Sequence, residues 1–171
     1  MTQSRLHQLS ALGQSVWFDT LSREILRSGK LARLMEDDAV VGVTSNPTIF
    51  QKALAAGDAY DDQLRAQLQE ELDPKELFIR RAARGIAEAC DLLRKVWDGG
   101  GGQDGYVSIE VDPTLAFDTE GTIAEAQRLH ELIDRPNLFV KIPATEPGLP
   151  AIEEMISRGR SINVTLIFSL E

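Results

Sequence analysis

Apolar residues occur along the chain in two alternating patterns, as short continuous runs and at helical spacing. Five of the runs have the length of a strand and end next to polar residues. Buried parallel strands are near-continuous runs of Val, Ile and Leu, so these runs predict strands. The predicted strands comprise residues 15–19, 39–43, 105–112, 138–145 and 162–168.

Between these runs, apolar residues recur every three or four positions, which predicts amphipathic helices. Residues 21–35 form one such segment, but Gly29 interrupts it, so two short helices are expected there. Asp73 and Pro74 form a typical helix start, with Asp73 as the N-cap and Pro74 in the first helical position. Further helices are expected over residues 5–13, 49–72, 75–97, 123–133 and 148–157.

The alternation of strands and helices without a hairpin signal predicts βα units and a parallel sheet. An open doubly wound sheet is one candidate, but no G-x-G-x-x-G motif follows its first strand, and the glycines at 99–102 follow a helix. In a barrel, functional residues lie at the carboxyl ends of the strands, where this sequence has its polar residues. The sequence therefore predicts an α/β fold of the TIM (β/α)8 barrel type, with the first five βα units in a single domain over residues 1–171.

Lys141 lies in the middle of an aliphatic strand, where a lysine is rarely buried without a function or a partner. Desolvation favours the neutral form of an amine, and a neutral amine is a nucleophile toward carbonyl carbon. Glu110 lies on the preceding strand between Ile109 and Val111, where an isolated carboxylate needs a partner. Lys141 and Glu110 form either a purely structural ion pair or part of a site for Schiff-base chemistry.

Other polar residues at strand ends extend this candidate site. Strand alternation places Asn163 and Thr165 on one face of their strand, and Thr44 and Asn46 on one face of theirs. Asp19 ends the first strand. If these faces point into one end of a barrel, an amine, two carboxylates, two amides and several hydroxyls converge on one pocket.

The composition limits the classes of partner. The net charge of -9, from 27 acidic and 18 basic residues, argues against nucleic acid or an anionic membrane as the main partner. Cys90 is the single cysteine, so neither an internal disulfide nor a cysteine-rich metal site is expected, and a cytoplasmic location is predicted. No apolar segment approaches the ~18 residues of a membrane span. His7 and His130 form no metalloprotease motif, so no metal and no cofactor are expected.

Five segments resemble the transaldolases of the class I aldolase superfamily, and they occur in that family's order. Residues 41–50, VGVTSNPTIF, resemble the first signature of the family, in the form typical of its bacterial branch. Residues 138–156, LFVKIPATEPGLPAIEEMI, resemble the second signature and include the lysine. Residues 17–19, 107–113 and 162–169 match further segments, so the resemblance covers nearly the whole chain.

This resemblance implies a role for each strand-end residue. Lys141 would form an imine with C2 of a ketose phosphate, and Asp19 would be the general acid/base. Glu110 and Thr165 would hold and activate the water used in imine formation. The implied substrate-binding residues are Thr44, Asn46, Asn163 and Ser169.

The implied reaction belongs to the pentose phosphate pathway and needs no cofactor. It transfers a dihydroxyacetone unit from sedoheptulose 7-phosphate or fructose 6-phosphate to glyceraldehyde 3-phosphate or erythrose 4-phosphate. The resemblance also implies that family members continue through three more βα units, which contain their phosphate-binding serine and arginine. We therefore expect residues 1–171 alone to show little transaldolase activity.

Two other functions fit the same residues. A lyase similar to fructose-6-phosphate aldolase would share Lys141 but release the three-carbon unit, whereas the combination of Asp19 and Glu110 favours the transferase. A non-catalytic partial barrel would instead pair with a second copy or another partner to complete its sheet. Five parallel strands leave two open edges, so a homo-oligomer that closes an edge is a natural expectation.

Overall fold

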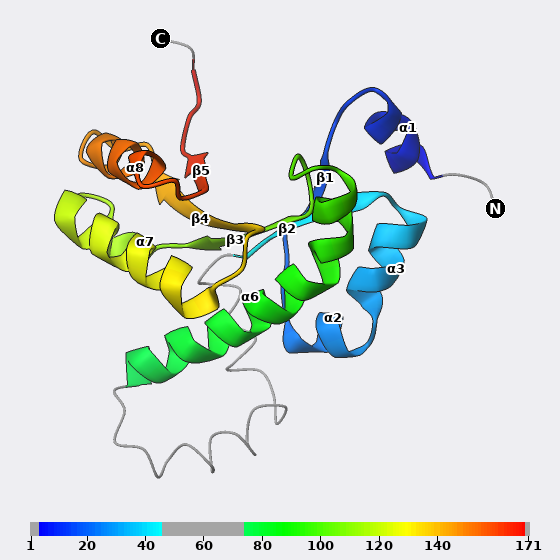
Figure 1. Ribbon diagram of the computed structural model, residues 1–171, viewed down its shortest axis with the longest axis horizontal. Helices are drawn as coiled ribbons and strands as arrows, with labels where there is room; N and C mark the ends of the chain where they lie inside the picture. The colour runs from blue at the N-terminus through cyan, green and yellow to red at the C-terminus, as the bar shows by residue number, and fades with distance from the viewer. Residues whose placement is uncertain (1–3, 46–73, 170–171) are drawn as a thin grey trace.

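A computed structural model describes residues 4–45 and 74–169 of the protein. Five parallel strands form one sheet, and they follow one another in chain order across it. The sheet is curled and has helices along its outer side, as Figure 1 shows. This arrangement confirms the predicted α/β class and the partial TIM barrel. The strands are β1 (Val16–Phe18), β2 (Val40–Thr44), β3 (Tyr106–Glu110), β4 (Leu138–Pro143) and β5 (Ile162–Thr165).

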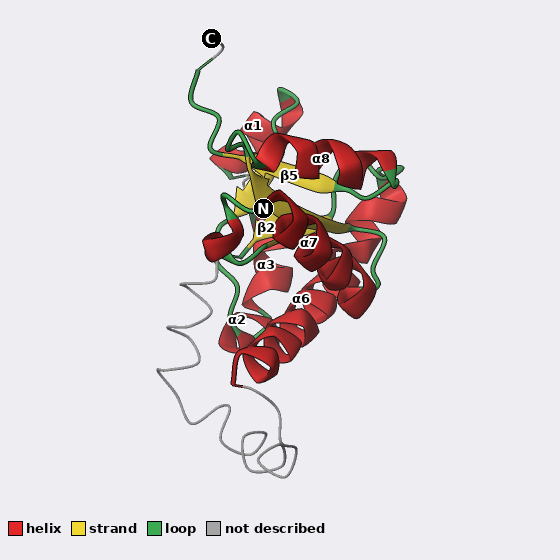
Figure 2. Ribbon diagram, turned by 90° about the vertical axis from the view of Figure 1, so that its left-hand side faces the viewer, coloured by secondary structure: helices red, strands yellow, loops and turns green. Residues whose placement is uncertain are grey.

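The helices α6 (Pro74–Gly99), α7 (Thr119–Ile133) and α8 (Gly148–Ser157) lie beside the sheet (Figure 2), whereas α1 (Arg5–Ala11) precedes the first strand and lies apart from them, next to β1 (Figure 1). Two short helices flank Gly29, as predicted, and the φ angle of Gly29 is 70°, which a glycine adopts without strain. The helix predicted over residues 49–72 lies outside the described residues. Within residues 4–45 and 74–169, no helix is both long and apolar enough to cross a membrane. Further helices are α2 (Arg23–Arg27), α3 (Lys30–Asp37) and the 3-10 helix η2 (Pro113–Leu115).

Two element boundaries differ from the prediction by three residues or more. The fifth strand was predicted over residues 162–168 but ends at Thr165, because Leu166 has a φ angle of 66° that takes the chain out of the strand conformation. The helix predicted over residues 123–133 begins earlier, at Thr119. Its N-cap is Asp118, whose carboxylate accepts a hydrogen bond from the backbone N–H of Gly121. The first turn of this helix is polar, so apolar spacing did not reveal it.

The hydrophobic core lies between the outer side of the sheet and the helices. Alternate residues of β3 and β4 point into this core and are at most 8% exposed. Each buried aliphatic side chain stabilises the fold by about 1.5–3 kcal/mol, so this pattern fixes which face of each strand is turned outward. The residues of opposite parity, Glu110 and Lys141 among them, therefore face the inner side. The outward-pointing residues are Val107, Ile109, Leu138, Val140 and Ile142.

A buried asparagine ties the amino end of β4 to its neighbours. Asn137 is fully buried, and its side-chain nitrogen donates to the carbonyls of Cys90 at 2.9 Å and Gly105 at 2.7 Å. Its own carbonyl accepts the backbone N–H of Val107 at 3.0 Å. Burial raises the pKa of the Cys90 thiol to about 12, so Cys90 stays protonated and packs as a small core residue, as predicted.

The stability of the fold is expected to fall in mild acid because of His130 on α7. This side chain is 7% exposed, and burial lowers its pKa to about 4, with the charge of Arg160 acting in the same direction. A hydrogen bond with the backbone of Ser161 acts in the opposite direction. The folded state therefore favours the neutral ring. Burial of the neutral His130 ring contributes fully to the free energy of unfolding above the unfolded pKa of 6.5. This contribution is lost as the pH falls toward 4, and the free energy of unfolding decreases by roughly 2–4 kcal/mol in total.

Urea unfolding between about pH 7 and pH 4.5 tests this expectation. The free energy of unfolding of His130→Gln should fall less steeply with decreasing pH than that of the unsubstituted chain. An NMR titration of the His130 ring in the folded chain should give a midpoint near 4. Equal slopes for the two proteins would show that His130 does not control the acid sensitivity.

Candidate functional site

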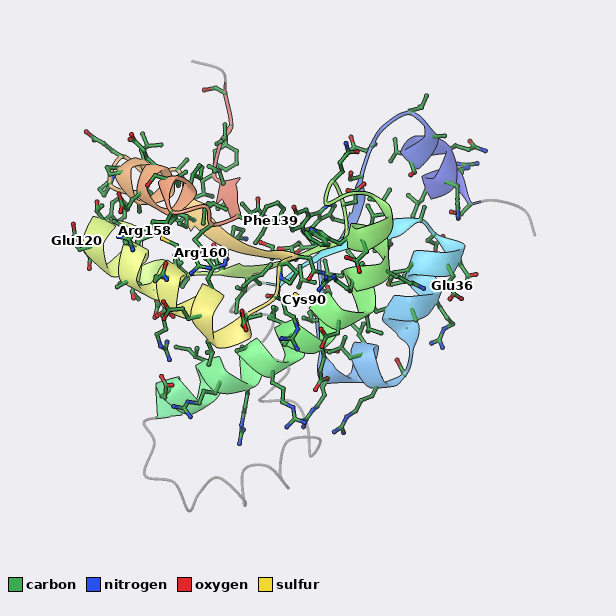
Figure 3. The ribbon with its side chains drawn as sticks, viewed as in Figure 1. Glu36, Cys90, Glu120, Phe139, Arg158 and Arg160 are labelled. Atoms are coloured by element: carbon green, nitrogen blue, oxygen red, sulfur yellow. The ribbon has the colours of Figure 1, made fainter. Side chains whose placement is uncertain are left out.

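The inner face of the sheet holds the candidate site, on the side opposite the core. In Figure 3, the side chain of Phe139 lies on one side of the strands, and Cys90, a residue of α6, lies on the other. Register partners on neighbouring parallel strands point to the same side of a sheet. The register therefore arranges the inner side chains in layers, from the amino ends of the strands to their carboxyl ends.

The layer nearest the amino ends is aromatic. Trp17, Gly42 and Tyr106 are register partners on β1, β2 and β3. Phe139 stacks on Tyr106 with a centroid distance of 4.0 Å, and its ring lies 6.2 Å from that of Trp17. Gly42 leaves room for Trp17, since a Cβ at this position would lie 2.4 Å from the indole ring. We call Trp17, Tyr106 and Phe139 the aromatic floor, because they fill the inner face below the polar side chains.

Lys141, Glu110 and Asn163 form a polar row above the aromatic floor. The register pairs Lys141 with Glu110 on one side and with Asn163 on the other. The Nζ atom of Lys141 lies 3.2 Å from Oε2 of Glu110, and the two side chains are 18% and 20% exposed. The ion-pair partner expected for Glu110 is thus confirmed. An amine beside a carboxylate, both within reach of solvent, can exchange a proton and attack a carbonyl carbon.

Two hydroxyl residues of the candidate set share this inner face. Thr165 is the register partner of Pro143, two residues beyond Lys141 on β4. Thr44 is the register partner of Ser108, two residues before Glu110 on β3. The structure therefore brings an amine, a carboxylate, an amide and two threonines to the inner face, toward the carboxyl ends of four adjacent strands.

The other candidates lie apart from this row or outside the described residues. Asp19 follows β1, at the opposite edge of the sheet from β5, and is exposed. Asp19 forms no hydrogen bond or ion pair with Lys141 or Glu110, all three being described residues. Ser169 lies in the exposed segment after β5, and Asn46 lies outside the described residues. Over residues 4–45 and 74–169, no group of three or more His, Cys, Asp or Glu side chains is placed to hold a metal ion.

The loop after β4 is held by hydrogen bonds that the sequence analysis did not identify. The hydroxyl of Thr145 donates to the carbonyl of Ala116 and accepts the N–H of Gly148 at 3.1 Å. The hydroxyl of Thr119 donates to the carbonyl of Pro147 at 2.6 Å. These bonds join the loop after β4 to the loop after β3 and to the first residue of α7, next to the strands of Lys141 and Glu110. The available signal was the threonine and glycine that follow the lysine in the segment 138–156.

Comparisons of the sequence with known proteins point to one family. The sequence profile of the family described as transaldolase/fructose-6-phosphate aldolase matches residues 16–171. The chain is 55% identical over 166 residues to a transaldolase of Frankia alni and 56% identical over 168 residues to one of Thermobifida fusca. It is 45% identical over 171 residues to transaldolase 2 of Nostoc punctiforme.

The alignments cover unequal shares of the two sequences. They include 97%, 98% and 100% of this chain but 45%, 46% and 45% of the Frankia, Thermobifida and Nostoc proteins. The chain thus spans a little under half the length of these relatives.

Proposed function

Because the chain belongs to the transaldolase/fructose-6-phosphate aldolase family, we propose that it supplies the Schiff-base residues of a transaldolase, with Lys141 as the nucleophile. The 3.2 Å contact between Lys141 and Glu110 on the inner face of a partial barrel is the observation that supports this most directly. The proposed reaction transfers a dihydroxyacetone unit from a ketose phosphate to an aldose phosphate.

The first proposed step is the formation of an imine on Lys141. The neutral amine attacks the C2 carbonyl of the ketose phosphate, and the resulting carbinolamine loses water to give a protonated imine. Lys141 must release a proton before it attacks, and Glu110 is a carboxylate within hydrogen-bond distance of its nitrogen. Glu110 and Thr165 are proposed to hold the water that leaves in this step and returns at hydrolysis.

The second proposed step is cleavage of the C3–C4 bond. The protonated imine accepts the electron pair of this bond, while a general base removes the proton of the C4 hydroxyl. Asp19 is proposed as this base, and it returns the proton when the aldehyde of the acceptor is attacked. Asp19 follows the edge strand β1, so the substrate would extend across the inner face from β4 toward β1.

The bound three-carbon unit would be held by side chains around the imine. Asn163 is the register partner of Lys141, which supports a role in binding hydroxyls next to the new C=N bond. Thr44, Asn46 and Ser169 are proposed as further substrate-binding residues. A dihydroxyacetone unit whose hydroxyls are satisfied in this way would remain bound until an acceptor arrives.

A lyase is the second candidate, because the matching family includes fructose-6-phosphate aldolases and the imine chemistry is the same. The two enzymes differ in the fate of the three-carbon unit. Incubation with fructose 6-phosphate alone would release free dihydroxyacetone from a lyase. A transferase would form sedoheptulose 7-phosphate only after erythrose 4-phosphate is added.

The proposal also includes the location of the protein in the cell. The single cysteine is reduced and buried, which supports a cytoplasmic location.

Exposed apolar residues near the β5 edge, Val164, Ile167 and Phe168, support self-association of a non-catalytic partial barrel as the third candidate. Light scattering that gives the mass of one chain would argue against self-association.

Borohydride trapping tests the proposed chemistry. The chain is incubated with fructose 6-phosphate, or with dihydroxyacetone as a ketone without phosphate, and is then reduced, digested and mapped by mass spectrometry. We expect an adduct on Lys141. With fructose 6-phosphate, a six-carbon adduct shows imine formation alone, whereas a three-carbon adduct shows that the C3–C4 bond was also cleaved. A folded chain with no adduct on Lys141 would contradict the proposal.

A further inference from the structure

We propose that Ser108 is a positioning residue that orients the amide of Asn163 for the substrate bound at Lys141. This inference rests on the proposed function, because it gives a role at the same site to a residue that the resemblance leaves without one. Ser108 acts through Asn163, since its hydroxyl contacts Asn163 rather than the amine.

The hydrogen bond between these two residues spans a strand. Ser108 lies on β3 and Asn163 on β5, with β4 between them. The Nδ2 atom of Asn163 donates to Oγ of Ser108 at 3.1 Å. Asn163 is the register partner of Lys141, and Ser108 lies two residues before Glu110 on the same face. The hydrogen bond therefore lies next to the Lys141–Glu110 pair, on its amino-terminal side.

Ser108 is itself held in place. Its side chain is fully buried, and its register partners are Thr44 on β2 and Phe139 of the aromatic floor on β4. Its carbonyl accepts the backbone N–H of Ser45 at 3.0 Å and the hydroxyl of Ser45 at 3.2 Å. A buried side chain on a fixed backbone has few accessible rotamers. The Ser108 hydroxyl is thus a rigid acceptor.

This hydrogen bond determines where the Asn163 amide lies. An asparagine side chain has an acceptor oxygen on one side and an NH2 group on the other, so rotation by about 180° exchanges them. A serine hydroxyl accepts from Nδ2 and can equally donate to the carbonyl oxygen, so Ser108 is a partner for the amide in either orientation. Within the described residues, no other hydrogen bond fixes this amide. With Ser108 in place, the amide stays at one position, and its remaining polar groups are available to the hydroxyls of the substrate.

A purely structural tie between β3 and β5 would have different consequences. Loss of such a tie would lower stability but would not change the substrate concentration needed to form the imine. Loss of a positioning residue raises that concentration, because the amide then adopts the binding orientation only part of the time. The trapping rate at saturation should stay the same, since Lys141 and Glu110 are unchanged.

NMR of the Asn163 side chain tests the positioning independently of any activity. The two side-chain N–H resonances are assigned by their absence in Asn163→Ala. In Ser108→Ala they should shift and exchange faster with solvent. Tyr106→Phe is the matched control, because Tyr106 is on the same face of β3 and its hydroxyl donates to the carbonyl of Gly102 at 2.8 Å. Asn163 resonances that are unchanged in Ser108→Ala would overturn the inference.

Trapping with dihydroxyacetone tests the consequence for substrate. The ketone concentration for half-maximal labelling of Lys141 should rise about three- to tenfold in Ser108→Ala, the effect of one weakened hydrogen bond, and stay unchanged in Tyr106→Phe. The double variant Ser108→Ala/Asn163→Ala should match Asn163→Ala alone. An unchanged concentration in Ser108→Ala overturns the positioning role, whereas failure of the unsubstituted chain to be labelled overturns the proposed function instead.

Discussion

Lys141→Arg is expected to abolish the borohydride-trapped adduct and to leave the chain folded. Arginine keeps the positive charge and can still pair with Glu110, which lies 3.2 Å from the lysine nitrogen. The guanidinium group is not deprotonated in proteins, so it cannot attack a carbonyl carbon to form an imine. The yield of labelled peptide should therefore fall at least about 100-fold, because no other group supplies the covalent bond.

Lys95→Arg is the matched control for this experiment. Lys95 on α6 pairs with Glu36 on α3 at 3.9 Å, and both side chains are exposed. This pair lies on the helices that cover the outer side of the sheet, not on the inner face of β4. This variant should be labelled at Lys141 as strongly as the unsubstituted chain. Circular dichroism should show the same helix content in all three proteins. Retention of the adduct in Lys141→Arg would place the imine on another lysine and would refute the assigned role of Lys141.

The strands and the central ion pair could be predicted because they depend on local pattern. Aliphatic runs gave the five strands, and alternation within β3 and β4 put Glu110 and Lys141 on the face opposite the core. Adjacent parallel strands then bring residues of the same face together, which is why the pairing of Glu110 with Lys141 followed from sequence. The same reasoning could not show how close Asp19 lies to the amine, because that depends on the curl of the whole sheet.

Other contacts could not be predicted because they join distant segments through loops. Asn137 looked like an ordinary residue of a connection, yet its amide joins α6 to the residue before β3. Ser108 and Asn163 are 55 positions apart, and their meeting requires the register of three strands at once. Leu166 shows the opposite error, since an apolar run continued past the point where the backbone leaves the strand conformation.

The position of β4 supports the proposal that Lys141 is the nucleophile. β4 has a neighbour on each side, so Glu110 from β3 and Asn163 from β5 flank the lysine. The aromatic floor lies on the inner face toward the amino ends of the strands, so we expect a substrate to approach from the carboxyl ends. The loops after β3 and β4 border that approach, and Thr145 joins them.

Gly148→Ala is expected to destabilise the fold by roughly 2–4 kcal/mol, although alanine is the better helix former. Gly148 is buried at the start of α8, and a Cβ there would lie 2.1 Å from the carbonyl oxygen of Pro143 and 2.9 Å from Oγ1 of Thr145. The Pro143 contact is with backbone at the end of β4, so it cannot be relieved by a side-chain rotation. The start of α8 must move away from β4, and the hydrogen bond between Gly148 and Thr145 is then weakened.

Gly99→Ala separates this steric effect from helix propensity. Gly99 is the last residue of α6, and a Cβ there would have no atom within 4 Å. Urea unfolding should show Gly99→Ala to be neutral or up to about 1 kcal/mol more stable, because alanine loses less backbone entropy than glycine in a helix. The opposite signs of the two variants are the decisive result. If both glycines tolerated alanine equally, the close approach of α8 to the end of β4 would not be what requires a glycine at position 148.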